Sequence, residues 1–177
     1  ISVVAGDRIS DNRLTDDANL ITPALVTLSA VNGIGVTGSS DILTDIGSLT
    51  ATNTESGNIV IRERDGLVLA PAGVSTLLGD SSVIITVEEG DFTVNGAVSV
   101  SGAGRLHLNA QGTSTAADLS VNASIQTASG SASLLARTDL SLSDNGSVAV
   151  LSGSGTLDLQ AIDGMLTMGA ASALQSN

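Results

Sequence analysis

A repeat of 23 residues is the feature that most restricts what this chain can fold into. Four of the six intervals between successive aliphatic stretches have this length, since 26−3, 49−26, 106−83 and 157−134 all equal 23. The stretches begin at Val3, Val26, Leu49, Val83, Leu106, Leu134 and Leu157. The other two intervals are longer by 11 and 5 residues, and we assign the excess to loop insertions at residues 71–82 and 111–118. A repeat with occasional insertions predicts a solenoid in which each repeat forms one coil.

Alternation within the repeats predicts β-strands. Leu106 and Leu108 flank a polar residue, and the same period of two recurs through the chain. A typical coil contains three such pieces, for example at residues 134–136, 140–142 and 148–150, separated by turn residues such as Gly, Ser and Asp. We therefore expect one domain over residues 1–177, an all-β, right-handed parallel β-helix of about seven triangular coils with two loop insertions.

The composition agrees with a narrow aliphatic core. Phe92 is the one aromatic residue, whereas sandwich domains usually build their cores around Trp and Tyr. Gly, Ser, Thr and Asn interrupt every helical pattern, and the nearest helical candidate, residues 70–78, contains Pro71 and Gly73 and is assigned to the first insertion. The inward leucines are expected to be almost fully buried: Leu106, Leu108, Leu140, Leu142, Leu157 and Leu159.

Missing residue types exclude several kinds of chemistry. The chain has no Cys, which excludes disulfides and thiolate catalysis, and all six basic residues are Arg, which excludes Schiff-base chemistry. A net charge of −12 argues against nucleic acid as a partner, because phosphates would be repelled. No segment reaches the roughly 18 apolar residues of a membrane-spanning helix, so no membrane insertion is expected. We predict no cofactor, and no catalytic or metal-ligating residue is assigned.

The two ends suggest a longer parent protein. The chain starts at Ile1 already in strand phase and ends at Asn177 in a polar turn. Bare end coils would expose unpaired strand edges, so we expect a piece of a longer solenoid whose partners are the flanking coils of the same chain.

Three strand units resemble a known family. The pieces at residues 24–30, 104–110 and 155–161, such as Gly155-Thr156-Leu157-Asp158-Leu159-Gln160-Ala161, are similar to the strand units of filamentous-haemagglutinin-like repeats in very large bacterial surface and secreted proteins. The resemblance extends from about residue 24 onward and depends on alternation and small residues. It implies a non-catalytic, extracellular adhesin shaft or surface fibre, in contact with a host or neighbouring cell, and carries over no catalytic residues.

A carbohydrate-active β-helix, such as a polysaccharide lyase or hydrolase, is the alternative class. Such an enzyme needs carboxylates with cationic residues on one sheet and usually aromatic platforms. His107 lies between two leucines, so alternation turns it outward, and we interpret it as a solvent-facing strand residue. Residues 62–65, Arg-Glu-Arg-Asp, are interpreted as a solvated, salt-bridged edge, and the acidic turn at residues 88–91 as hydrated.

One acidic feature leaves a calcium site open. Asp17, Asp41 and Glu63 fall at offsets of 14 or 15 residues from their coil starts, with Asp16 and Asp65 beside them. Stacked coils would place these carboxylates in a column at a spacing of about 5 Å, where a hard cation relieves their repulsion. The Gly-rich nonapeptide of calcium-loaded β-rolls is absent, and the two arginines of residues 62–65 offer an alternative neutralisation.

Overall fold

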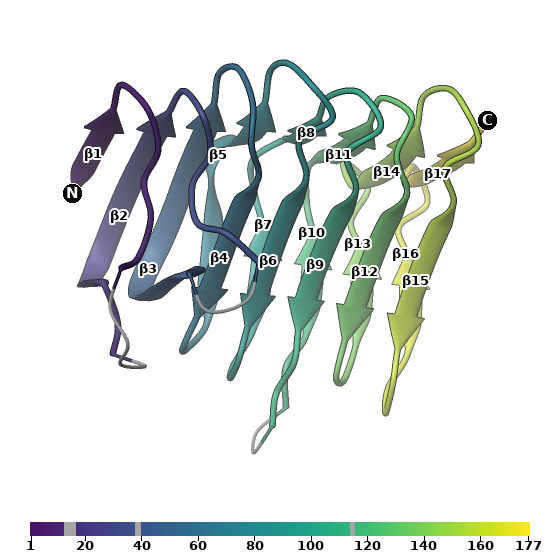
Figure 1. Ribbon diagram of the computed structural model, residues 1–177. Helices are drawn as coiled ribbons and strands as arrows, with labels where there is room; N and C mark the ends of the chain where they lie inside the picture. Colours follow the sequence, from purple (N-terminus) through teal and green to yellow (C-terminus); the bar gives the residue numbers. More distant parts are fainter. Residues whose placement is uncertain (13–16, 38–39, 114–115) are drawn as a thin grey trace.

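The chain forms a parallel β-solenoid. The computed structural model describes residues 1–12, 17–37, 40–113 and 116–177, and in these it contains 17 strands and no helix that could cross a membrane. The pairings between strands are parallel, and the strands stack in about seven turns, with the termini at opposite ends (Figure 1). The predicted all-β parallel solenoid is therefore confirmed.

The strands form three ladders, which we call the first, second and third sheets. The first contains β1 (Ser2–Ala5), the second halves of β2 (Leu20–Ala30) and β3 (Ile42–Asn53), the end of β5 (Leu67–Thr76), β8 (Val98–Val100), β11 (Ser124–Thr127), β14 (Ser147–Val150) and β17 (Ala173–Ser176). The second contains the first halves of β2 and β3, then β4 (Ile59–Glu63), β6 (Val83–Val87), β9 (Leu106–Ala110), β12 (Ala132–Ala136) and β15 (Leu157–Ala161). The third contains the start of β5, β7 (Phe92–Val94), β10 (Leu119–Val121), β13 (Leu140–Leu142) and β16 (Leu166–Met168). Figure 1 shows the second sheet in front of the third.

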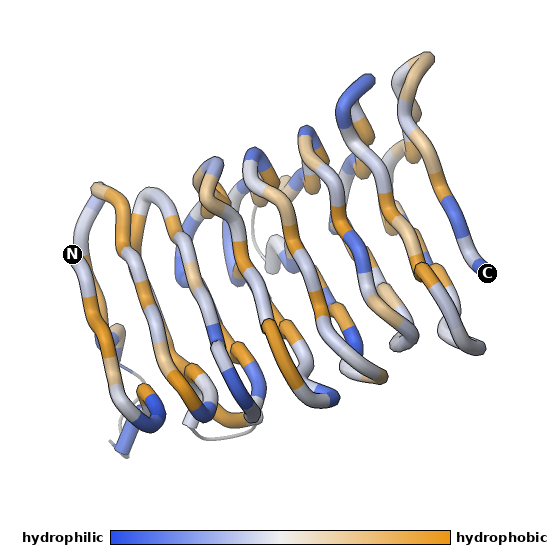
Figure 2. Tube along the Cα trace, turned by 90° about the horizontal axis from the view of Figure 1, so that it is seen from above, coloured by the Kyte–Doolittle hydropathy of each residue, from blue (hydrophilic) through white to orange (hydrophobic). Residues whose placement is uncertain are grey.

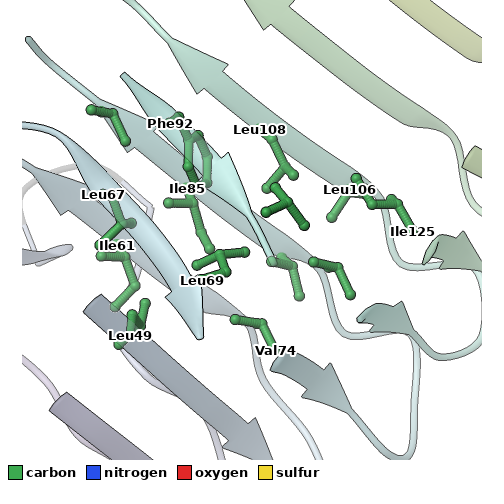
Figure 3. Close-up of a cluster of buried hydrophobic side chains, with 14 of the residues drawn as sticks. Leu49, Ile61, Leu67, Leu69, Val74, Ile85, Phe92, Leu106, Leu108 and Ile125 are labelled. Atoms are coloured by element: carbon green, nitrogen blue, oxygen red, sulfur yellow. The ribbon is translucent and has the colours of Figure 1, made fainter. Parts of the chain in front are cut away.

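Alternate residues of each strand point into the solenoid and form its core. The tube in Figure 2 shows hydrophobic and hydrophilic residues alternating along the coils. Phe92 is fully buried among aliphatic side chains that the three sheets contribute (Figure 3). Of the leucines expected inside, four are at most 2% exposed: Leu106, Leu108, Leu140 and Leu142. The predicted strand phase is confirmed at these positions.

The expectation of full burial is wrong for Leu157 and Leu159. Both lie on β15 with the expected phase and pack against the core, but they are only partly buried. β15 pairs with β12 on one side and belongs to the last coil, so no described coil covers its other side. Burial in a solenoid requires a neighbour on each side of the coil, and strand phase alone does not supply it.

The predicted 23-residue register holds only in part. Val26 pairs with Leu49 and Val83 with Leu106, as the repeat requires. Val3 instead pairs with Leu28 and Leu134 with Leu159, each two residues later than predicted. Leu106 pairs with Ala132, two residues earlier than predicted. A register shift of two residues keeps every side chain on its original face of the strand. The inward residues were therefore predicted correctly although their partners were not.

The first predicted insertion, residues 71–82, is wrong. β5 occupies residues 71–76 of it, where Val74 and Thr76 are buried with 1% and 2% exposure, and only residues 77–82 lie outside the strands. Pro71 lies where β5 passes from the third sheet to the first, and an exposed bend tolerates its missing N–H. Leu49 consequently pairs with Leu69, and Val83 stacks on Ile59 in another sheet. The long interval between Leu49 and Val83 is therefore not a loop insertion, because it contains the additional strands β4 and β5. The described residues of 111–118, in contrast, lie outside the strands as predicted.

Three glycines stack where the chain enters the second sheet. A Cβ added to Gly130 would lie 1.9 Å from the carbonyl oxygen of Gly104, and one added to Gly155 would lie 2.5 Å from that of Gly130. Real Cβ atoms do not approach backbone so closely, so these coils contact each other only because the side chains are absent.

Replacing Gly130 with alanine is expected to lower the free energy of unfolding by about 1 to 3 kcal/mol, the usual cost of overpacking. The matched control is Gly6→Ala, because a Cβ at Gly6 has no atom within 4 Å. Urea unfolding followed by circular dichroism measures both. Equal stabilities for the two variants would show that the coils can separate at this corner without cost.

Candidate functional site

The predicted column of Asp17, Asp41 and Glu63 does not form. β3 pairs with β4 so that Thr44, three residues beyond Asp41, lies beside Glu63. Asp17 is exposed and Glu63 is fully buried, while Asp16 lies outside the described residues. The prediction assumed coils of nearly equal length, but in the second sheet paired residues are 24 apart between β2 and β3 and only 19 apart between β3 and β4. Across the described ranges, no three His, Cys, Asp or Glu side chains are arranged to hold a metal ion.

Arg62 binds acidic residues from two neighbouring coils. Its Nε donates to Asp41 Oδ2 at 2.8 Å, and its Nη1 donates to Glu88 Oε1 at 2.9 Å. These three side chains retain only 17% to 31% of their exposure. The interpretation of this region as a salt-bridged edge is therefore confirmed for Arg62. Glu88, which was expected to lie in a hydrated turn, is ion-paired and 31% exposed.

Glu63 was wrongly assigned to that solvated edge. It is the next residue after Arg62 in an alternating strand, so it points inward, where it has no exposed surface. Its Oε2 accepts a hydrogen bond from Thr44 Oγ1 at 2.5 Å, and its Oε1 accepts one from the backbone N–H of Ile46 at 3.0 Å. Burial raises the pKa of the Glu63 carboxyl, and these hydrogen bonds offset only part of that rise.

His107 faces outward from β9, as alternation predicts. Its neighbours in register are Ile84 on β6 and Ser133 on β12, and it is partly buried between them. Partial burial lowers the pKa of the imidazole and the Arg105 guanidinium lowers it further, while Asp158 acts in the opposite direction. These effects together favour the neutral form of the ring, and its neighbours are those of an outward-facing strand residue.

A shallow depression of about 280 Å³ lies where three successive coils meet near the N-terminal end. β2 contributes residues 21–23, β3 contributes residues 45–47, and the turn after β4 contributes Asp65 and Gly66. The depression brings Asp45 and Asp65 to one hollow with apolar walls. From the sequence, Asp65 was placed beside the acidic column and in the salt-bridged edge of residues 62–65, and Asp45 was not singled out.

A ladder of aspartates along the third sheet was also missed. Asp91 Oδ1 accepts the N–H of Asp118 at 3.1 Å, Asp118 Oδ1 accepts that of Asp139 at 3.0 Å, and Asp139 Oδ1 accepts that of Met165 at 2.7 Å. Each carboxylate thus satisfies the backbone of the next coil at a corner. The signal was visible in the sequence, since each aspartate directly precedes the first apolar residue of a strand.

Because comparisons with known proteins found no match, inferences about function depend on the fold and on these side chains. The chain matches no family model, no curated protein and no solved structure.

Proposed function

We propose that this chain is a structural segment, the shaft of a large exported bacterial protein that contacts a host or neighbouring cell. The observation that carries the proposal is the direction of its polar side-chain bonds. The aspartate ladder and the contacts of Arg62 connect each coil to the next along the solenoid axis. Bonds in this direction strengthen a rod along its length.

The surfaces of the sheets support the same proposal. Outward positions of the third sheet carry small residues in register, including Thr93, Ser120 and Ser141, and Ser141 Oγ donates to Ser120 Oγ at 3.3 Å. On the first sheet Ser75 and Ser99 occupy equivalent places. Such faces repeat with each coil and are compatible with a shaft whose adhesive function belongs to the parent protein. The proposed location is extracellular, as the resemblance to haemagglutinin-like repeats implies.

A carbohydrate-active enzyme is the second candidate, and the depression near the N-terminal end is the observation that favours it. Asp45 and Asp65 both line this hollow. Two carboxylates on either side of a sugar bond are what an acid–base glycosidase requires.

Incubation with a panel of polysaccharides separates the two candidates. We expect no release of reducing ends or of unsaturated sugars, with or without added Ca²⁺. Asp45→Asn and Asp65→Asn serve as matched variants, because each replaces one carboxylate of the depression with an amide of the same shape. Cleavage by the unmodified protein that either variant loses would establish the enzyme and overturn the structural proposal.

A further inference from the structure

The buried carboxyl of Glu63 lies in an aliphatic column of the second sheet. In register, Thr44, Glu63, Val87 and Ala110 occupy equivalent inward positions on successive coils. Thr44 and Glu63 are buried polar residues, and the column continues with the aliphatic side chains of Val87 and Ala110. A charged group in such surroundings is costly unless a cation pairs with it. Arg62, the nearest arginine in sequence on β4, points outward to two other carboxylates, Asp41 and Glu88.

The hydrogen bonds around Glu63 fit a neutral acid. Oε1 accepts from the N–H of Ile46 at 3.0 Å and lies 3.4 Å from the N–H of Asp65, as a carbonyl oxygen would. In the ionised form Thr44 Oγ1 donates to Oε2 at 2.5 Å. With a proton on Oε2 this short hydrogen bond would reverse, and Oε2 would donate to Thr44 Oγ1. The Thr44 hydroxyl would then donate to the backbone oxygen of Arg62, 3.4 Å away. No donor or acceptor of the group is left without a partner in this arrangement.

We propose that Glu63 binds a proton inside the folded coil stack, and that this proton fastens the corner between β3 and β4, so that the contribution of this residue to stability increases as the pH falls. The corner holds β3 against β4 through Thr44 and Ile46. The proton is thus the ligand of a pH-sensitive latch inside the coil stack. This inference is independent of the proposed shaft function.

Other charged residues lie around the corner. They lie at outward or turn positions of β3, β4 and the end of β6: Asp41, Asp45, Arg62, Arg64, Asp65 and Glu88. Two of them, Asp41 and Glu88, form ion pairs with Arg62, and all six groups contribute to any measurement on the whole protein. The latch must therefore be measured by removing Glu63 itself and not from the pH profile of the whole protein.

The direction of the pH effect follows from proton binding. Burial raises the pKa of Glu63 above its value in the unfolded chain, so the folded state holds the proton at pH values where the unfolded state has released it. Stability from this group is fully present below the unfolded pKa and is lost as the pH rises toward the folded pKa. The loss therefore begins at about pH 4.3, the ordinary value for Glu, and continues upward.

Glu63→Gln tests the latch, because glutamine mimics the neutral acid and does not titrate. Its amide nitrogen can donate to Thr44 Oγ1 while its oxygen accepts from Ile46. We expect the urea midpoint of Glu63→Gln to lie above that of the wild type at about pH 8 and to approach it at about pH 4.5. Glu88→Gln is the control for the loss of one negative charge, since Glu88 faces outward on the neighbouring coil. We expect this variant to show no increase in the urea midpoint at either pH.

Two results would overturn the proposal. One is a Glu63→Gln protein that is less stable than the wild type at both pH values, which would mean that the ionised carboxylate is the form that the fold stabilises. The other comes from carbon-13 NMR of the wild type, where the Glu63 carboxyl carbon should titrate well above an ordinary glutamate. A midpoint at the ordinary value rejects the latch even if the glutamine variant fails to fold.

Discussion

Deletion of residues 71–81 is expected to abolish cooperative folding. The second half of β5 pairs on one side with β3, where Val74 lies beside Ala51, and on the other with β8, where it lies beside Val98. Removing it would leave two parallel strands without their hydrogen-bond partners and open the core at Val74 and Thr76. Circular dichroism during heating measures the outcome, and the expected result is loss of the cooperative transition.

Leu77→Ser combined with Leu78→Ser is the control for this deletion. The two side chains are 54% and 60% exposed in the same segment, so the double variant should change the free energy of unfolding by about 0.5 kcal/mol or less per site. A deletion protein that unfolds cooperatively near the wild-type temperature would show that residues 71–81 form a dispensable loop, as the repeat spacing alone had suggested.

The error about this segment shows what a sequence repeat can and cannot reveal. Alternation identifies the inward residues because the period of two is a property of every strand. It does not identify which sheet a strand joins, since the three sheets carry the same aliphatic pattern. Leu49 and Val83 look equivalent in sequence, yet they lie in different sheets, and the pairing of Leu49 with Leu69 left no periodic signal. The fold class was predictable, but the length of each coil was not.

The candidate site was less predictable than the fold, for a related reason. The placement of Asp41 and Glu63 in one column depended on nearly equal coil lengths. The paired residues of the second sheet are 24 apart between β2 and β3 but 19 apart between β3 and β4, and this difference of five residues prevents the column from forming. The aspartate ladder depends only on the residue directly before each strand of the third sheet. It does not require coils of equal length, because the chain turns at this point in each of these coils. Local features of a repeat can thus be inferred from sequence, whereas features that combine several coils require the register.

Leu140→Ala is expected to lower the free energy of unfolding by about 2 to 5 kcal/mol, and Leu166→Ala by about 1 kcal/mol or less. The two leucines pair directly in register on β13 and β16, so they share one column, one residue type and one backbone conformation. They differ in burial, because Leu140 has no exposed surface, whereas Leu166, in the last coil, is 43% exposed.

Chemical denaturation of both variants separates two explanations of the stability of this solenoid. If neighbouring coils provide the stabilisation by covering each other, the loss in free energy of unfolding increases with burial, and it is several-fold larger for Leu140→Ala than for Leu166→Ala. If each coil were stable by itself, truncations at equivalent positions would cost the same, and equal losses at the two sites would reject the nearest-neighbour view. Because Leu140 and Leu166 occupy the same position in adjacent strands, strand geometry does not differ between the two sites. The ratio of the two losses in free energy of unfolding therefore measures how much each coil depends on the next.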